Sequence, residues 1–327
     1  MNVHDWLLDS DPAIRWQVMR DLSDLPAEVV TDERARVATE GWGARLLSLQ
    51  GEDGQWAGGA HFPDDFDWGN VERGEDGRMK NQPWTATSWS LSLLRTFGLD
   101  PGSPEAKRAV ALVRENSRWD HDGQRFFDGE VEPCINGLTV AIGAYFGEDV
   151  AGIVDRLLDE QMEDGGWNCE QENGSVRGSF HTTIAVLEGL LEYQGSSNGS
   201  STVDEARSRG EEYLLARGLL RRLSDGEIVD DRWTSFHFPP WWRYDVLRGL
   251  EYATRAGVKP DDRVDEALDL VEQNRLADGR WTRRVHSGDI HFEMDEPEGQ
   301  PSHWNTLRAL RVLKWAGREA SQPVETA

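Results

Sequence analysis

Apolar residues recur at helical spacing in a series of segments along the chain, and an Asp-Gly dipeptide follows each segment. Val154, Leu157 and Leu158 show the spacing of one helical face, and Val264, Leu268 and Val271 repeat it. Asp-Gly favours a turn, because Gly readily adopts positive φ and Asp binds nearby backbone N–H groups. The pattern predicts five helices over residues 44–50, 110–116, 153–161, 213–220 and 264–273, with turns at Asp53-Gly54, Asp122-Gly123, Asp164-Gly165, Asp225-Gly226 and Asp278-Gly279.

A polar loop and a second apolar segment follow each of these turns. Most of the second segments open with Pro, Ser or Thr, which favour the first turn of a helix. Their predicted starts lie near residues 83, 133, 179, 239 and 301. Because the second segments are apolar on several faces, they are expected to be buried between neighbours, whereas the more charged first helices form an outer layer.

The repeat predicts an all-α fold, with five to six helical hairpins in an inner and an outer layer. We expect one domain over residues 1–327. Asp11-Pro12 opens a further short helix, so residues 1–30 form a partial hairpin, and residues from about 318 to 327 are expected to be a flexible tail.

The amino-acid composition excludes some classes of binding partner. The 327-residue chain has 35 Lys and Arg against 60 Asp and Glu, a net charge of −25, which excludes the cationic footprint that nucleic acid needs. It has no apolar run long enough to span a membrane. The acidic residues 1–11 do not form a signal peptide and two cysteines cannot build a disulfide framework, so a cytoplasmic location is expected.

One turn carries a family resemblance. The segment Gln161-Met162-Glu163-Asp164-Gly165-Gly166-Trp167 resembles the Gln-Trp repeat of squalene-type terpenoid cyclases and the related repeat of protein prenyltransferase β subunits, and residues 50–56 and 273–281 are weaker copies. The resemblance implies an α/α toroid, in which inner helices line a central cavity and sites form near the inner-helix starts. Alternatively, Gln161 and Trp167 are architectural: the Gln ties an outer helix to the next turn, and the Trp packs on it.

Potential zinc ligands stand at two successive inner-helix starts, where Glu132-Pro133-Cys134 is followed by His181. Carboxylate, thiolate and imidazole suit Zn²⁺, and three protein ligands leave a fourth position open for catalysis. The N-terminus of a helix also favours an anionic thiolate. Protein prenyltransferase β subunits bind zinc with an acid-x-Cys pair and a His in this order, although their acid is usually Asp. The resemblance thus implies a zinc site of Glu132, Cys134 and His181.

Alternatives to this zinc site remain open at the sequence level. Asp128 or Glu130 could supply the carboxylate, and Cys169 is either a fourth ligand or an unrelated thiol. Without a metal, Cys134 would be a small buried hydrophobe and His181 a hydrogen-bonded residue of the cavity wall.

Aromatic and polar residues also gather at the predicted inner-helix starts. Aromatic walls with a few polar groups are typical of pockets for apolar ligands, and aromatic faces stabilise carbocations. The predicted cavity residues are Trp84, Trp242, His303 and Trp304. The predicted catalytic residues are Arg125 and Arg243, which would meet an anionic leaving group, together with Tyr244 and Asp245.

Three functions fit these residues. The first is a zinc-dependent transferase or cyclase acting on an isoprenoid or similar apolar substrate. The second is a non-catalytic toroid that binds a lipid or a peptide; it is favoured because the one acidic cluster, Asp64-Asp65-Phe66-Asp67, falls in a loop and no aspartate-rich diphosphate motif occurs. The third is a carbohydrate-active toroid with paired carboxylates such as Glu132 and Asp245.

Overall fold

The structure is a computed structural model, and it describes residues 2–74, 77, 79–196 and 199–318. Residues 319–327 of the predicted tail lie outside the described residues. In the described part the fold is an α/α toroid, as predicted, and its β-structure is limited to isolated bridges. No helix in those ranges combines the length and the apolar character that a bilayer span requires.

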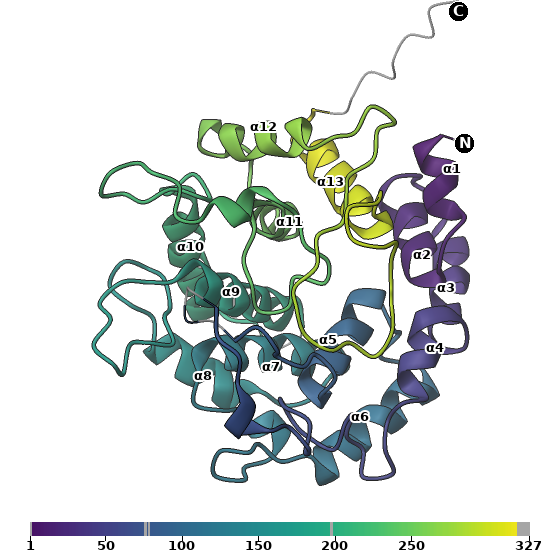
Figure 1. Cartoon of the computed structure of the whole chain (residues 1–327), viewed down its shortest axis with the longest axis vertical. Helices are drawn as coiled ribbons and strands as arrows, with labels where there is room; N and C mark the ends of the chain where they lie inside the picture. The colour runs from purple at the N-terminus through teal and green to yellow at the C-terminus, as the bar shows by residue number, and fades with distance from the viewer. Residues whose placement is uncertain (1, 75–76, 78, 197–198, 319–327) are drawn as a thin grey trace, which may run out of the picture.

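Six inner helices form a closed ring, because each contacts the next and the last contacts the first (Figure 1). The inner helices are α2 (Pro12–Asp21), α5 (Thr87–Phe97), α7 (Pro133–Phe146), α9 (Phe180–Gly195), α11 (Val246–Ala256) and α13 (His303–Trp315). Their outer partners are α1 (Val3–Leu8), α4 (Gly41–Leu47), α6 (Pro104–Asn116), α8 (Ala151–Asp159), α10 (Ser201–Leu215) and α12 (Asp265–Gln273). The first partial hairpin, α1 with α2, therefore completes the ring.

One further helix and five short 3₁₀ segments lie in the connections. They are α3 (Ala27–Ala35), η1 (Arg36–Ala38), η2 (Trp68–Asn70), η3 (Phe126–Asp128), η4 (Asp231–Thr234) and η5 (Asp262–Val264).

The Asp-Gly turns have the predicted backbone, since their five glycines have φ between 68° and 87°. In three of the turns a fully buried Trp donates its indole N–H to the carbonyl ten residues earlier, at the end of the outer helix. These bonds are Trp56 to Leu46 (2.8 Å), Trp167 to Leu157 (2.7 Å) and Trp281 to Val271 (2.7 Å). The backbone N–H of each Trp donates to a Thr hydroxyl of the paired inner helix. Each Trp thus joins an outer helix to its inner partner.

Two glutamines tie neighbouring hairpins together. The Gln161 amide donates to Gly165 O in its own turn and to Ala206 O in the next outer helix, each at 2.8 Å. Gln50 makes the same pair of bonds, to Gly54 O and to Ala109 O. These contacts match the architectural role considered for the Gln and Trp residues.

Two inner helices begin later than predicted. Pro83, Pro239 and Pro240 lie in loops, and helices α5 and α11 start at Thr87 and Val246. The N-cap of α11 is Asp245, whose carboxylate accepts a hydrogen bond from Arg248 N at 2.9 Å. The start at residue 239 was wrong because a capping carboxylate, and not the proline pair, marks the first turn.

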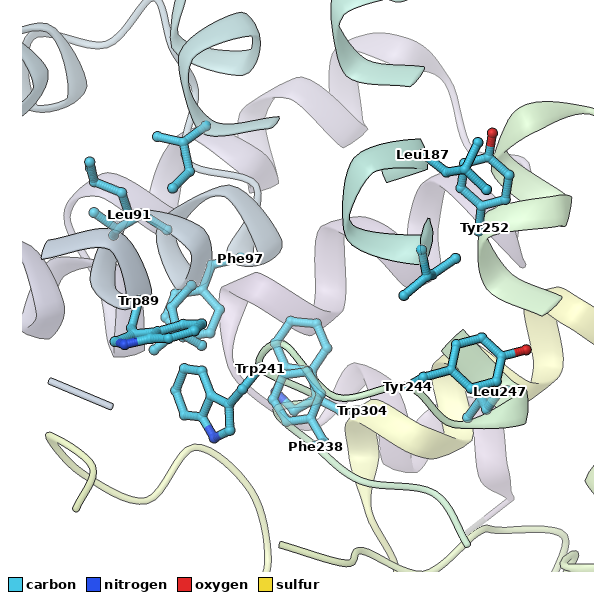
Figure 2. Packing of buried hydrophobic residues seen from close by; sticks show 14 of the residues in the cluster. Trp89, Leu91, Phe97, Leu187, Phe238, Trp241, Tyr244, Leu247, Tyr252 and Trp304 are labelled. Atoms are coloured by element: carbon cyan, nitrogen blue, oxygen red, sulfur yellow. The ribbon is translucent and has the colours of Figure 1, made fainter. Parts of the chain in front are cut away.

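Because α11 starts later than predicted, the residues before it form a loop that lies over the inner-helix starts. We call this loop, residues 236–245, the sealing loop. It pairs with the loop before α13, where Phe238 N donates to Arg284 O at 3.1 Å. Its Phe238 ring stacks on Trp304 at 4.4 Å, and Trp241 stands edge-on to Trp89 at 5.8 Å (Figure 2). Aromatic side chains therefore fill the ring at this end.

Candidate functional site

The main cavity lies inside the ring, along the middle and C-terminal parts of the inner helices. Its volume is about 700 Å³, within the usual range for small-molecule sites. Eight cationic side chains and four carboxylates line it, although the chain as a whole has a net charge of −25. The cations are Arg20, Arg34, Arg95, Arg248, Arg255, Arg308, Arg311 and Lys314, and the acids are Asp21, Glu188, Glu192 and Glu251.

Ion pairs hold the cavity carboxylates. Arg248 binds Glu188 in a bidentate pair at 2.9 and 2.7 Å. Burial opposes ionisation of Glu188, but Arg248 outweighs it and the pKa of Glu188 is lowered. Arg308 binds Glu251 at 2.8 Å, and Arg311 reaches Asp21 at 2.6 Å. Each cavity acid is therefore paired with at least one arginine.

Three guanidinium groups keep an unused donor in this cavity. Within the described residues, Arg95 Nε, Arg308 Nη2 and Arg311 Nε are buried and make no hydrogen bond. Burial, aided by nearby Arg20, lowers the pKa of Arg311, although Asp21 and Glu251 act in the opposite direction. Buried donors without acceptors are costly, so these three nitrogens are unfavourable to the fold as it stands.

The two ends of the cavity differ in exposure. At the C-terminal ends of the inner helices the side chains of Arg20, Arg255 and Lys314 are 51%, 43% and 37% exposed. At the other end, Phe238 and Trp304 are buried. The charged end of the cavity is therefore the accessible end, whereas the sequence placed the mouth at the inner-helix starts.

Three of the predicted site residues share a second cavity, of about 680 Å³, on the far side of the sealing loop. It is lined by His181, Arg243 and Tyr244, with His237 and His286 stacked at 4.1 Å. Burial, with a smaller contribution from the neighbouring cationic groups, strongly lowers the pKa of His286. The His286 imidazole is therefore neutral.

Tyr244 and Asp245 serve the fold at this position. The Tyr244 hydroxyl donates to Leu219 O at 2.6 Å, and burial raises its pKa well above the ordinary value. Besides capping α11, the buried Asp245 carboxylate accepts a hydrogen bond from His237 N at 3.0 Å. Burial opposes its charge, but the His237 hydrogen bonds and Arg308 lower the pKa of Asp245. Both groups are therefore committed to backbone contacts.

Most of the aromatic residues that were predicted to line a pocket are packed against other side chains instead. Trp84 is fully buried and stacks on Trp241 at 5.0 Å, and Trp242 donates its indole N–H to Gln82 Oε1 at 3.0 Å. His303 stacks on Trp6 of the outer helix α1 at 3.7 Å. Of the four predicted cavity residues, Trp304 lines the main cavity, at its closed end.

Arg125 lies outside both cavities. It is exposed at the N-cap of η3, where its backbone bridges to Arg118, and it is not among the residues that line either cavity. Arg125 is therefore not placed to contact an anion in either cavity.

The predicted zinc ligands are only partly brought together. The ligand atoms of Glu132, Cys134 and Cys169 lie within 4.8 Å of one another, and His181 is not part of this group. The corners of a tetrahedron with arms of about 2.0–2.3 Å are about 3.3–3.8 Å apart, so these three groups fit a zinc ion after a small adjustment. None of the three lines the main cavity.

In the metal-free chain the Cys134 thiol is protonated. Contact with Cys169 contributes most, and burial and the Glu132 carboxylate add to it, so the pKa of Cys134 lies well above the ordinary value. Cys169, burial and Glu132 all favour the protonated thiol, so the pKa of Cys134 shifts in the direction opposite to that expected at a helix start.

The inner-helix arginines were missed by the sequence analysis, although a signal existed. Arg248 and Arg255 are seven residues apart in α11, and Arg308 and Arg311 are three apart in α13. Such spacing places charges on one face of a helix that is otherwise buried. A basic stripe on an inner helix points to a polar cavity.

Comparisons with known proteins give only remote similarity. No family model and no curated protein matches the chain. A crystal structure of a protein from Actinoplanes has a TM-score of 0.45 and 16% identity, over 94% of this chain and 90% of that one. The type II terpene cyclase MstE from Scytonema, in its apo form, has a TM-score of 0.44 and 16% identity, over 94% and 88%. Similarity at this level assigns neither a family nor an activity.

Proposed function

We propose that this terpenoid cyclase-like toroid binds an amphiphilic anion, an isoprenoid-like chain with a phosphate or diphosphate head, in its main cavity. One observation carries the proposal: eight cations against four acids line a cavity inside a protein of net charge −25. An acidic exterior repels anions, so this local excess of positive charge needs a specific reason.

The chemistry of the cavity favours a phosphate head. Guanidinium groups bind phosphate and carboxylate oxygens through paired N–H donors. Arg95, Arg308 and Arg311 line the cavity, so their guanidinium groups are candidates for such contacts. Because several cations converge, a multiply charged head gains more than a single carboxylate does.

Apolar residues in the same cavity suit the rest of the ligand. Leu93, Leu138 and Trp304 line it, and Trp315 lies at the exposed end. The resemblance of the turns to those of terpenoid cyclases and protein prenyltransferases suggests an isoprenoid for this part of the ligand.

Binding is better supported than catalysis. Protonation of an alkene needs a neutral carboxylic acid, whereas the pKa values of Glu188 and Asp21 are lowered, since the arginines outweigh burial. A zinc held by Glu132, Cys134 and Cys169 would supply Lewis-acid chemistry, but these residues are not in the cavity wall. We therefore favour the binding module over the zinc-dependent transferase.

The test is a calorimetric titration with farnesyl diphosphate, farnesol and inorganic diphosphate. We expect the first to bind most tightly, and Arg95→Met to weaken it by about 10–100-fold, the value of a charged hydrogen bond. Arg125→Met, on the exposed surface, and Arg243→Met, in the second cavity, are matched controls that should leave affinity unchanged. Equal affinity for farnesol, no binding, or a loss caused by Arg243→Met and not by Arg95→Met would contradict the proposal.

A further inference from the structure

Two cysteines from neighbouring hairpins meet outside the main cavity. Cys134 is the second residue of α7, and Cys169 lies in the loop that leads to α9. Their Sγ atoms are 3.0 Å apart, and Glu132 Oε2 is 3.5 Å from Cys134 Sγ. Thr182 Oγ1 of α9 is 3.4 Å from Cys169 Sγ. Two soft ligands and one carboxylate thus converge from segments about 35 residues apart.

The fold positions these groups firmly. Trp167, two residues before Cys169, is fixed by its bonds to Leu157 O and to Thr183 Oγ1. Helices α7 and α9 approach closely at Gly137, where a Cβ atom would lie 2.6 Å from the Ala185 backbone. The thiols are therefore placed by a rigid frame and not by a free loop, which reduces the entropy cost of binding an ion.

His181 belongs to a different face of the same helix. Successive residues of an α-helix point about 100° apart, so Thr182 facing Cys169 directs His181 elsewhere. His181 Nδ1 accepts the Tyr244 backbone N–H at 2.8 Å, and its ring stands edge-on to Trp242 at 5.2 Å. The imidazole thus faces the sealing loop.

We propose that Cys134, Cys169 and Glu132 form a zinc site that joins the third and fourth hairpins outside the main cavity. Thiolates and carboxylates suit Zn²⁺, and a water completes the four positions. When the ion binds, both thiols release their protons to solvent and no redox change takes place. The site links the start of α7 to the loop before α9, and its role is structural.

The experiment uses the full-length protein, purified under reducing conditions, with zinc quantified by elemental mass spectrometry after removal of free metal. The variants are Cys134→Ser, Cys169→Ser, Glu132→Gln and, as the discriminating control, His181→Ala. We expect about one zinc per chain in the wild type and in His181→Ala. The two Ser variants should lose the zinc, and Glu132→Gln should bind it at least about tenfold more weakly.

Thermal unfolding with and without zinc gives a second readout. Zinc at about a hundred times its Kd should raise the Tm of a chain of this size by about 3–4 °C. His181→Ala should show the same shift, and Cys169→Ser should show none. Cobalt substitution, followed by the thiolate-to-metal absorption band, reports the ligands directly.

Three results would overturn the site. They are a zinc that survives Cys169→Ser but is lost in His181→Ala, a reduced wild type that binds no zinc, and a Cys134–Cys169 disulfide in the purified protein that excludes metal. Farnesyl diphosphate titrations of Cys169→Ser keep this proposal separate from the previous one, because they should be unchanged whichever result is obtained.

Discussion

The inner helices have aromatic residues at one end of the ring and charged residues at the other, and the main cavity opens at the charged end. At the helix starts, Trp84 stacks on Trp241 and Trp304 stacks on Phe238 of the sealing loop, and these rings are buried. At the helix ends, Arg255 and Lys314 remain partly exposed around the cavity. Flat rings fill space completely, whereas guanidinium groups must keep contact with water or an anion. Many tryptophans therefore mark the closed end and not the mouth.

Two arginines make contacts at both ends of the ring. Arg248 pairs with Glu188 in the cavity and donates to Trp241 O and Arg243 O in the sealing loop, at 3.0 and 2.7 Å. Arg308 likewise donates to His237 O at 3.1 Å. The sealing loop at the aromatic end is thus held by arginines that also line the cavity at the charged end. Substitutions can separate these two roles of the arginines.

The largest effect is expected at the sealed end. Trp84→Ala removes a fully buried ring that stacks on Trp241, and it should cost about 3–5 kcal/mol of unfolding free energy. Urea denaturation measures this, and Trp242→Ala, which truncates a half-buried Trp, is the matched control with a smaller loss. Equal losses in the two variants would show that the sealed end is not tightly packed.

A slightly smaller loss is expected where the two ends meet. Arg248→Met leaves Glu188 without its bidentate partner, and breaking a buried ion pair typically costs about 3–5 kcal/mol. The lower part of that range applies, because Arg95 and Arg255 still act on the Glu188 charge. In Arg248→Met/Glu188→Leu much of the stability should return, as measured by denaturation. A double variant no more stable than the single one would refute the coupling.

At the exposed end, binding should change more than stability. Arg255→Glu combined with Lys314→Glu reverses two charges at the cavity edge, and affinity for farnesyl diphosphate should fall about tenfold or more. Because exposed ion pairs contribute only about 0–1 kcal/mol each, unfolding should change little. Calorimetry at low and at moderate salt checks this. A loss of stability without a loss of affinity would place the ligand elsewhere.

The effect that is smallest at neutral pH is a difference in acid sensitivity. Burial lowers the pKa of His61, which lies beside Trp89, to about 3. The unfolded chain takes up this proton near pH 6.5 and the folded chain does not, so His61 reduces stability as pH falls from about 6.5 toward 3, by at most about 1.4 kcal/mol per pH unit. Denaturation of His61→Gln at several pH values should show a flatter profile over this window.

The cavity carboxylates act in a lower window. The pKa of Glu188 is lowered in the folded chain, so its contribution is complete above the unfolded pKa of about 4.3 and is lost below it. Glu188→Gln should therefore alter the profile only below about pH 4–5. If His61→Gln and Glu188→Gln changed the same window, the contrast between the two ends would be wrong.

The sequence predicts the repeated part of this fold well. The Asp-Gly turns, the buried tryptophans of three turns and the inner layer follow from local rules that operate in each hairpin. The sealing loop is different: it occurs in one hairpin, and its backbone is held by Arg248 of the next helix and by Arg308 from 71 residues away in the sequence. No local pattern encodes such contacts, so aromatic residues near helix starts were interpreted as an open pocket.

The candidate sites show the same limit. Glu132 and Cys134 are two residues apart in sequence and lie together as expected, but the third member of the group is Cys169. The position of a helix start does not by itself determine which side chain faces the neighbouring hairpin. Thr182, and not His181, points toward Cys169, so His181 is not among the potential zinc ligands. In the sequence alone, the cavity arginines cannot be distinguished from ordinary surface charges. Only the closed ring of helices places them inside the protein.

A crystal structure of the protein with a non-hydrolysable farnesyl diphosphate analogue tests the central claim most directly. The account predicts density in the main cavity, with the diphosphate against Arg95 and Arg311 and the apolar chain directed toward Trp304. Density in the second cavity beside His181 and Arg243, or the diphosphate at the sealed end, would contradict it.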